Sequence, residues 1–113
     1  MENSILIARL QLLLMKQMEV NWNISLESWR AEIDSIDAEL LRLLNKRASL
    51  VMEIGRLKLR AGVPFYDPTR EQNILARANQ INIGPMDKRA ITKIFRRIIF
   101  ESRRIASDPN IKT

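Results

Sequence analysis

The chain contains no cysteine and no histidine, and these absences exclude whole classes of chemistry. Without cysteine there is no disulfide, thiol nucleophile or thiolate ligand, and without histidine there is no imidazole acid, base or ligand. Nearly every zinc, haem or iron–sulfur site is excluded with them. We therefore expect no cofactor and no metal, and any chemistry must rely on fixed charges and hydrogen bonds.

Helix-breaking residues are also scarce, with three glycines and four prolines among 113 residues. Between residues 25 and 61 there is no proline, Gly55 is the only glycine, and apolar residues recur at spacings of three and four. This pattern predicts one long helix over residues 25–61, with Ser25 as its N-cap. Gly62 and Pro64 end it, because glycine favours a C-terminal cap and proline cannot continue the helical hydrogen bonds.

No hydrophobic run is long enough to cross a membrane. Residues 1–24 are rich in Ile, Leu and Met, but Arg9 and Lys16 interrupt them, and the unbroken apolar run at residues 12–15 is far too short for a span. The segment also lacks the basic start and the cleavage site of a signal peptide. We predict an N-terminal extension, partly helical, that packs as an accessory helix or stays loosely attached. Docking to a membrane or a partner is the less favoured alternative.

Two further helices are predicted, each preceded by an aspartate. Asp67 is an N-cap followed by Pro68 at the favoured first helical position, which predicts a helix over residues 68–81. Its inward residues are expected to be Ile74, Leu75 and Ala78. Asp87 predicts the cap of a third helix, which extends to about residue 107 and leaves residues 108–113 as a C-terminal tail. The sequence thus predicts an all-α fold, a three-helix protomer whose domain spans residues 25–107.

The long predicted helix carries a heptad pattern, in which two positions are apolar almost throughout. These positions are filled by Leu26, Ile33, Leu40, Arg47, Ile54 and Ala61, and by Trp29, Ile36, Leu43, Leu50 and Leu57. A helix of about 36 residues is roughly 54 Å long, whereas a compact chain of this size has a radius of gyration of roughly 13 Å. Its own domain cannot enclose such a rod, so we expect a second copy of the chain to cover this heptad seam.

Arg47 is the exception in the heptad seam. A guanidinium there needs an anionic partner, and no carboxylate occupies either position, so a bound anion is the simplest candidate. Lys58, eleven residues later, returns to within about 20° of the same helix face, so the two can line one pocket. The side chain of Arg30 points about 100° away from that of Arg47 and lies roughly 25 Å from it along the helix axis. Arg30 therefore reaches the pocket of a partner subunit more easily than the pocket of its own chain. Taken singly, each of the three could instead be a solvated surface side chain.

The net charge of +6 and the pI near 10.3 favour an anionic partner. Nucleic acid, a membrane surface and a small polycarboxylate all meet that description, and charge alone does not choose among them. No nucleic-acid-binding motif is present, and the basic residues do not form a stripe with interleaved aromatic residues. We therefore expect no nucleic-acid partner, and with no segment able to span a bilayer we expect no membrane partner either.

A wider set of residues has the spacing of a known family. It consists of Trp29-Arg30-Ala31-Glu32-Ile33-Asp34, Ile36-Asp37, Leu40-Leu41, Leu43-Leu44, Arg47, Ile54-Gly55, Lys58, Pro64, Asp67, Arg70-Glu71, Ile94-Phe95 and Ser102. This set strongly resembles the AroQ class of chorismate mutases. The resemblance covers about residues 26–106 and includes the spacing across all three predicted helices and two loops.

The resemblance implies an intertwined, cytoplasmic homodimer with shared active sites. Such an enzyme converts chorismate to prephenate, without a cofactor, in the synthesis of phenylalanine and tyrosine. Within each site, Arg47 and Arg30 of the partner subunit would hold the two substrate carboxylates, and Lys58 would donate to the ether oxygen.

The resemblance implies roles for four more residues. Asp67 and Glu71 would position the ring hydroxyl of the substrate, while Arg70 and Ser102 would complete the contacts with its carboxylates. Together with Lys58 and Arg47, Glu71 would be a catalytic residue of the site.

One position departs from the family. Its members usually carry Gln or Glu one helical turn after the serine, where this chain has Ala106. The change removes a second hydrogen bond to the ether oxygen, so we expect a weak mutase or one activated by a partner, such as another shikimate-pathway enzyme, unless Arg103 or Ser107 substitutes. Two alternatives stay open. One is an isochorismate pyruvate-lyase-like enzyme, which the mutase-type residues 67–71 argue against, and the other is a non-enzymatic basic helical binding module.

Overall fold

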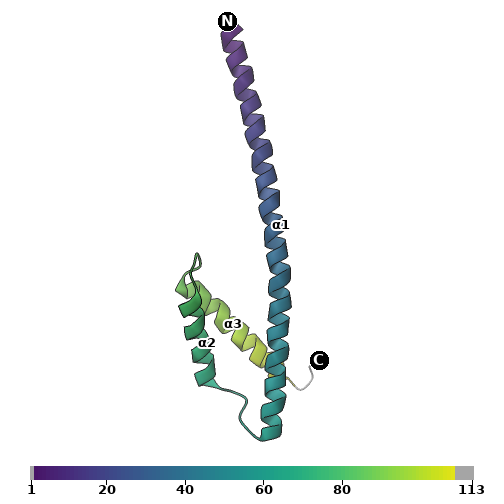
Figure 1. Cartoon of the computed structure of the whole chain (residues 1–113), viewed down its shortest axis with the longest axis vertical. Coiled ribbons are helices and arrows are strands. Elements are labelled where there is room, and N and C mark those ends of the chain that lie inside the picture. Colours follow the sequence, from purple (N-terminus) through teal and green to yellow (C-terminus); the bar gives the residue numbers. More distant parts are fainter. Residues whose placement is uncertain (1, 109–113) are drawn as a thin grey trace. The chain divides into compact units, whose positions relative to one another are not determined.

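The computed structural model describes residues 2–108, which form three α-helices and no strand (Figure 1). Helix α1 spans Glu2–Ala61, α2 spans Pro68–Ile81 and α3 spans Lys88–Ser107. The prediction of an all-α chain with three helices is confirmed. The structure divides into two units, one up to Leu40 and one from Leu41 onward, so that α1 contributes to both.

The predicted start of the long helix at Ser25 is wrong, because α1 begins at Glu2 and Ser25 lies inside it. No glycine or proline precedes Gly55, so nothing in this part of the sequence interrupts helical hydrogen bonding. A serine acts as an N-cap only where the backbone leaves helical geometry, and elsewhere it is tolerated within a helix. Residues 2–24 are therefore helical throughout, not partly.

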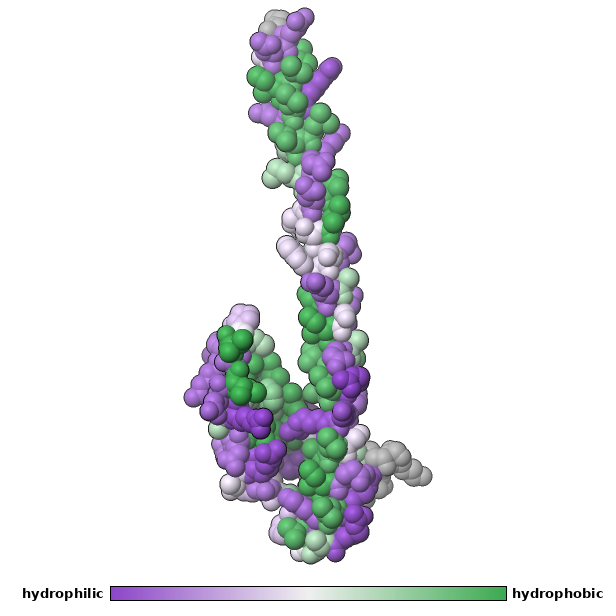
Figure 2. Space-filling model, viewed as in Figure 1, coloured by the Kyte–Doolittle hydropathy of each residue, from purple (hydrophilic) through white to green (hydrophobic). Residues whose placement is uncertain are grey.

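The heptad seam is exposed in the first unit. Trp29 is 63%, Ile33 54% and Ile36 59% exposed, and Figure 2 shows hydrophobic residues at the surface along this helix. Contiguous apolar surface of this kind is unusual on a monomeric protein and marks a site of interaction. None of the helices within residues 2–108 is long and apolar enough to cross a membrane.

In the second unit, α2 and α3 pack against each other and hold the buried apolar side chains. Leu75 and Ala78 of α2 and Ile99 of α3 are each no more than 8% exposed, and Ile74 is half-buried. The inward face predicted for α2 is therefore confirmed. This helix pair forms one side of the site described below.

The N-terminal caps of α2 and α3 are those that the sequence predicts. Asp67 Oδ1 accepts a hydrogen bond from the backbone N–H of Arg70 at 3.0 Å, and Asp87 Oδ1 accepts one from that of Ala90 at 2.8 Å. Each bond satisfies an N–H that has no partner within the helix. Of the predicted C-terminal tail, only Asp108 lies within the described residues.

Helix α1 ends at a glycine cap, also as predicted. Gly62 has a φ of +68°, a backbone geometry that residues other than glycine rarely adopt. The N–H of Val63 reaches back to the carbonyl oxygen of Lys58 at 2.9 Å and so satisfies the end of the helix. The loop at residues 62–67 then carries the chain to the start of α2 (Figure 1).

Candidate active site

The second unit contains a cavity of about 290 Å³. Its walls come from the last turns of α1, the loop before α2, and residues of α2 and α3. The polar lining consists of Arg47, Lys58, Asp67, Arg70, Glu71, Ser102 and Arg103, and the apolar lining of Leu50, Val51, Ile54, Phe65, Ile74 and Ile99. Segments far apart in the sequence therefore meet around one space.

Six of the seven residues predicted for the site line this cavity, and Arg30 does not. Arg30 belongs to the first unit, where its guanidinium lies 3.6 Å from the carboxylate of Glu27 on the same helix. The two side chains are 64% and 74% exposed, and ion pairs between such exposed groups contribute little. This weak pairing leaves the guanidinium of Arg30 accessible to another molecule.

Arg47 has the properties of an anion-binding residue. Its Nη1 donates to Ser102 Oγ at 3.1 Å, and Ser102 is only 5% exposed. Burial lowers the pKa of the Arg47 guanidinium, and the nearby charge of Arg70 lowers that pKa further. Both effects disfavour the charged form. A bound anion would relieve both, because it supplies the opposite charge where water has been lost.

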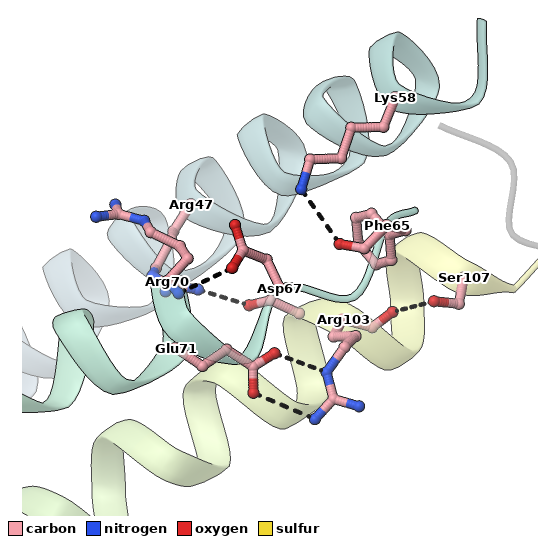
Figure 3. A network of polar contacts seen from close by, with 9 residues as sticks. Arg47, Lys58, Phe65, Asp67, Arg70, Glu71, Arg103 and Ser107 are labelled. Carbon is pink, nitrogen blue, oxygen red and sulfur yellow. Dashed lines mark hydrogen bonds and ion pairs between the residues drawn. The ribbon is translucent and has the colours of Figure 1, made fainter. Parts of the chain in front are cut away.

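Lys58 extends from α1 toward the loop before α2 (Figure 3). Its Nζ donates to the carbonyl oxygen of Phe65 at 3.3 Å. Gly55 makes room for this arrangement, since a Cβ at that position would lie 3.2 Å from the Phe65 ring. An ammonium group carries three N–H donors, so one contact with the carbonyl leaves two for a ligand in the cavity.

The carboxylate of Glu71 forms an ion pair with Arg103 that the sequence analysis missed. Arg103 Nε lies 2.9 Å from Glu71 Oε2, and Arg103 Nη2 donates to Glu71 Oε1 at 3.4 Å (Figure 3). The guanidinium also lies over the ring of Tyr66, 4.6 Å from its centroid. The pair joins α2 to α3 across the cavity. In the sequence, the only signal was their opposite charge, which many other pairs share.

Neither Ala106 nor Ser107 lines the cavity. Ser107 is exposed, and its Oγ donates to the carbonyl oxygen of Arg103 in its own helix at 2.8 Å. The structure therefore gives no support to Ser107 as a substitute for the donor missing at Ala106. Arg103 does line the cavity, but its guanidinium is directed at Glu71 (Figure 3).

The cavity is lined by four cations and two carboxylates, which gives it a net charge of +2 when all are ionised. The cations are Arg47, Lys58, Arg70 and Arg103, and the carboxylates are Asp67 and Glu71. Apolar walls limit the access of water and so strengthen each electrostatic contact. A small ligand with two negative charges fits this composition, and its hydroxyl groups could donate to the carboxylates. Within residues 2–108, no cluster of carboxylates could hold a metal ion.

The fold and the cavity define a class: an all-helical domain with a small cationic site enclosed by its helices. Residues 29–107 match the family model described as chorismate mutase type II. The chain belongs to the chorismate mutase type II family. The resemblance identified from the sequence is therefore confirmed, and so is the all-helical, three-helix fold of the single chain.

Among curated proteins, the similarity is to one part of longer chains. The bifunctional chorismate mutase/prephenate dehydratase of Aquifex aeolicus is 41% identical over 78 residues, which cover 66% of this chain and 22% of that protein. The T-protein of Enterobacter agglomerans is 39% identical over 89 residues, which cover 78% of this chain and 24% of that protein. This chain thus spans about a quarter or less of the length of these relatives.

Solved structures match over nearly their whole length. The chorismate mutase of Thermus thermophilus (form II) has a TM-score of 0.72 and 38% identity, covering 76% of this chain and 98% of that chain. The chorismate mutase of Helicobacter pylori, solved in complex with prephenate, has a TM-score of 0.68 and 34% identity, covering 77% and 97%. Most of this chain therefore corresponds to a complete chain of each of these structures.

We expect Ser102→Ala to destabilise the fold, because the hydroxyl of Ser102 accepts a hydrogen bond from the charged Arg47. Hydrogen bonds to charged groups contribute about 1.5–3 kcal/mol, and the partial exposure of Arg47 favours the lower end, about 1.5 kcal/mol. Urea unfolding followed by circular dichroism measures the loss.

The matched control is Ser107→Ala, which removes a hydroxyl from the exposed face of the same helix. Its hydrogen bond stays within α3, so the loss should be less than about 0.5 kcal/mol. Equal losses for Ser102→Ala and Ser107→Ala would show that the contact with Arg47 contributes nothing to the stability of the fold.

Proposed function

We propose that this chain is a chorismate mutase, an isomerase that rearranges chorismate to prephenate in the synthesis of phenylalanine and tyrosine. The observation that carries the proposal is the cavity with a net charge of +2, lined by Arg47 and Lys58 among its cations. Chorismate offers two carboxylates, an ether oxygen and a ring hydroxyl to such a site. Membership of the chorismate mutase type II family supports the proposal, and so does the prephenate complex of the Helicobacter pylori relative.

The reaction suits a site built only from charges and hydrogen bonds. A C–O bond breaks and a C–C bond forms in one step, without a nucleophile, a proton transfer or a cofactor. The protein has to hold the substrate in its compact conformer and stabilise the negative charge that grows on the ether oxygen. Fixed cations in a cavity with apolar walls do both, because the low polarity of the walls strengthens their attraction for that charge.

The cations would divide this work by their geometry. A guanidinium can bind a planar carboxylate through two parallel hydrogen bonds, so Arg47 and Arg70 would hold the substrate by its carboxylates. Ser102 would keep Arg47 in place through the hydrogen bond between them. Lys58 acts as a point charge and would donate one of its remaining N–H groups to the ether oxygen.

The two carboxylates would hold the ring hydroxyl of the substrate. Asp67 Oδ1 already accepts the N-cap hydrogen bond of α2, which fixes the side chain at the N-terminus of that helix. Glu71 lies one turn further on and is fixed by Arg103. Both therefore present oxygen atoms in defined places, which is what orientation of a bound hydroxyl requires.

The proposal includes a homodimer in which each site is completed by the partner. Leu40, Leu43 and Leu50 of the heptad seam are 46–57% exposed in the single chain, and a second copy packed along the seam would bury them. Apolar burial contributes roughly 25 cal/mol per Å². Arg30, exposed and only weakly paired, would then enter the partner's cavity, where it and Arg47 would each bind one carboxylate and Arg70 would complete these contacts.

Incubation of the purified protein with chorismate tests the proposal directly. Loss of chorismate absorbance with prephenate as the identified product is the expected result. Release of pyruvate from isochorismate, without prephenate from chorismate, would instead identify a lyase on the same fold. A protein inert towards both, but bound to nucleic acid in a salt-dependent way, would be a basic binding module.

We expect Arg47→Ala and Lys58→Ala to lower kcat/KM for chorismate at least a hundredfold while the protein stays folded. Each change removes one charge that stabilises the transition state, and loss of one such donor elsewhere costs about 10²–10³ in rate. Steady-state kinetics with circular dichroism measures both properties. Lys93→Ala, which removes an exposed cation of α3 outside the cavity, is the control and should change kcat/KM by less than about twofold. Near-normal kinetics in either cavity variant would contradict the assigned site.

Mixing two inactive variants tests the shared site. Protomers with Arg30→Ala lack the cation donated to the partner, and protomers with Lys58→Ala lack the cation of their own cavity. A heterodimer of the two has one cavity with both groups intact, so mixing should restore up to about half of the activity per heterodimer. Absence of any recovery, after subunit exchange has been verified by mass spectrometry, would argue against a contribution of Arg30 to the partner's site.

Ala106→Gln should supply the donor that the family usually carries. Ala106 itself does not line the cavity, but it follows Ser102 and Arg103, which do, by four and three residues on the same face of α3, so that a longer side chain at this position would extend towards the cavity. Because the added hydrogen bond strengthens mainly in the transition state, kcat should rise about tenfold, or about 1.4 kcal/mol, with a smaller change in KM. Ser107→Gln, on the exposed side, should leave kcat unchanged. An unaltered or lower kcat in a folded Ala106→Gln variant would place this position outside the reach of the ether oxygen.

A further inference from the structure

Arg103 is the one cation of the cavity to which the proposed chemistry assigns no contact with the substrate. We infer that Arg103 is a positioning residue, which fixes the carboxylate plane of Glu71 so that the carboxylate can accept a hydrogen bond from a ligand hydroxyl. This inference rests on the proposed function, because it deepens the role of Glu71 within the same site.

The first support is the geometry of the ion pair. Arg103 presents two neighbouring nitrogen atoms to Glu71, with Nε 2.9 Å from Oε2 and Nη2 3.4 Å from Oε1. Nη2 forms the hydrogen bond, whereas Nε has no hydrogen-bond partner and attracts the second carboxylate oxygen through the charge of the guanidinium. The two contacts lie along one edge, so together they restrict the rotation of the carboxylate more than a single contact would. An ionised carboxylate has about four acceptor positions, so the pair leaves others open towards the cavity.

The second support is that Arg103 is itself held in place. Its guanidinium lies 4.6 Å from the centroid of the Tyr66 ring and 5.8 Å from that of Phe100. Such contacts between a cation and aromatic faces restrict the long side chain of arginine. Tyr66 directly precedes Asp67, so the same guanidinium contacts the loop that carries the second carboxylate of the cavity.

The other two arginines of this part of α3 behave differently. Arg97 and Arg104 each lie 2.7 Å from a carboxylate oxygen of Glu101, within the same helix, and their side chains are 74% and 55% exposed. Those are surface ion pairs of small energetic weight. The Arg103 side chain is 34% exposed, and its partner Glu71, at 22%, lies on another helix. Only the pair formed by Arg103 joins two walls of the cavity.

Two other roles for Arg103 make different predictions. As a direct donor to the substrate, in place of the donor missing at Ala106, it would act independently of Glu71. As a mere source of positive charge, it could be replaced by lysine without loss. A positioning residue depends on Glu71 and on the planar fork of the guanidinium.

A double-mutant cycle separates these roles. We expect Arg103→Met to lower kcat/KM for chorismate about tenfold, less than the hundredfold that a displacement of about 1 Å can cost. In a Glu71→Gln background, where no charged carboxylate remains to be fixed, Arg103→Met should lower kcat/KM by less than about twofold. Arg103→Lys should recover part of the loss, since an ammonium reaches only one carboxylate oxygen.

Arg104→Met is the matched control, because it removes a paired arginine at the next position of the same helix, outside the cavity. It should leave kcat/KM unchanged. A full tenfold loss on Arg103→Met in the Glu71→Gln background would overturn the inference in favour of direct contact or a general structural role. Full activity of Arg103→Lys would overturn it in favour of charge alone.

The proposed function and this inference can fail separately. If the wild-type protein turns over chorismate, but the effects of Arg103→Met and Glu71→Gln on kcat/KM simply add, only the inference fails. If the wild-type protein does not turn over chorismate, the proposed function fails, and the same cycle is measured on the binding of prephenate by calorimetry. If Arg103→Met weakens prephenate binding in the wild-type background but not in the Glu71→Gln background, the positioning role is supported. If the two changes weaken binding independently of each other, or if no binding is detected, the inference is overturned.

Discussion

The second unit is organised around the half-buried charge of Arg47. A guanidinium at this heptad position cannot join the apolar seam, because its desolvation is costly without a partner. The partner that the structure provides lies on α3, where the buried hydroxyl of Ser102 accepts a hydrogen bond from Arg47. An apolar residue at position 47 would extend the seam and fill the space instead. Arg47 thus contributes to the lining of the cavity a cation that an apolar residue of the seam would not supply.

The site also depends on where the helices end. Gly62 ends α1 through a backbone geometry that favours glycine, and Asp67 begins α2 by capping it. The loop between them supplies the carbonyl of Phe65 to Lys58 and the ring of Tyr66 to Arg103. Local signals that serve the helix ends thus also set the positions of the functional groups. A change in the cap at Asp67 would act on stability and on the site together.

The single chain buries very little. Within the described residues, only three apolar side chains and Ser102 are buried, whereas most large apolar side chains of α1 are at least half exposed. Small chains that bury so little surface are marginally stable alone and gain stability from association. In the proposed homodimer, the same surface that stabilises the fold would bring Arg30 to the partner's cavity. Folding, association and the completion of the site would then be one coupled process.

The sequence by itself predicted the three helices, the end of α1 at Ala61, the start and end of α2 at Pro68 and Ile81, and six residues that line the cavity, because these rest on local signals. Glycine, proline and aspartate act on the backbone beside them, and helical periodicity places Arg47 and Lys58 on one face. The start of α1 was missed because a serine that suits an N-cap is also tolerated within a helix.

Tertiary structure alone decided the contacts between helices. Glu71 and Arg103 lie on α2 and α3, and the distance between them depends on how those helices pack, which no local signal specifies. The same holds for the bond of Arg47 to Ser102 and for the turn of Ser107 away from the cavity. A sequence fixes where charges lie along each helix, but only the packing of the helices decides which charges meet.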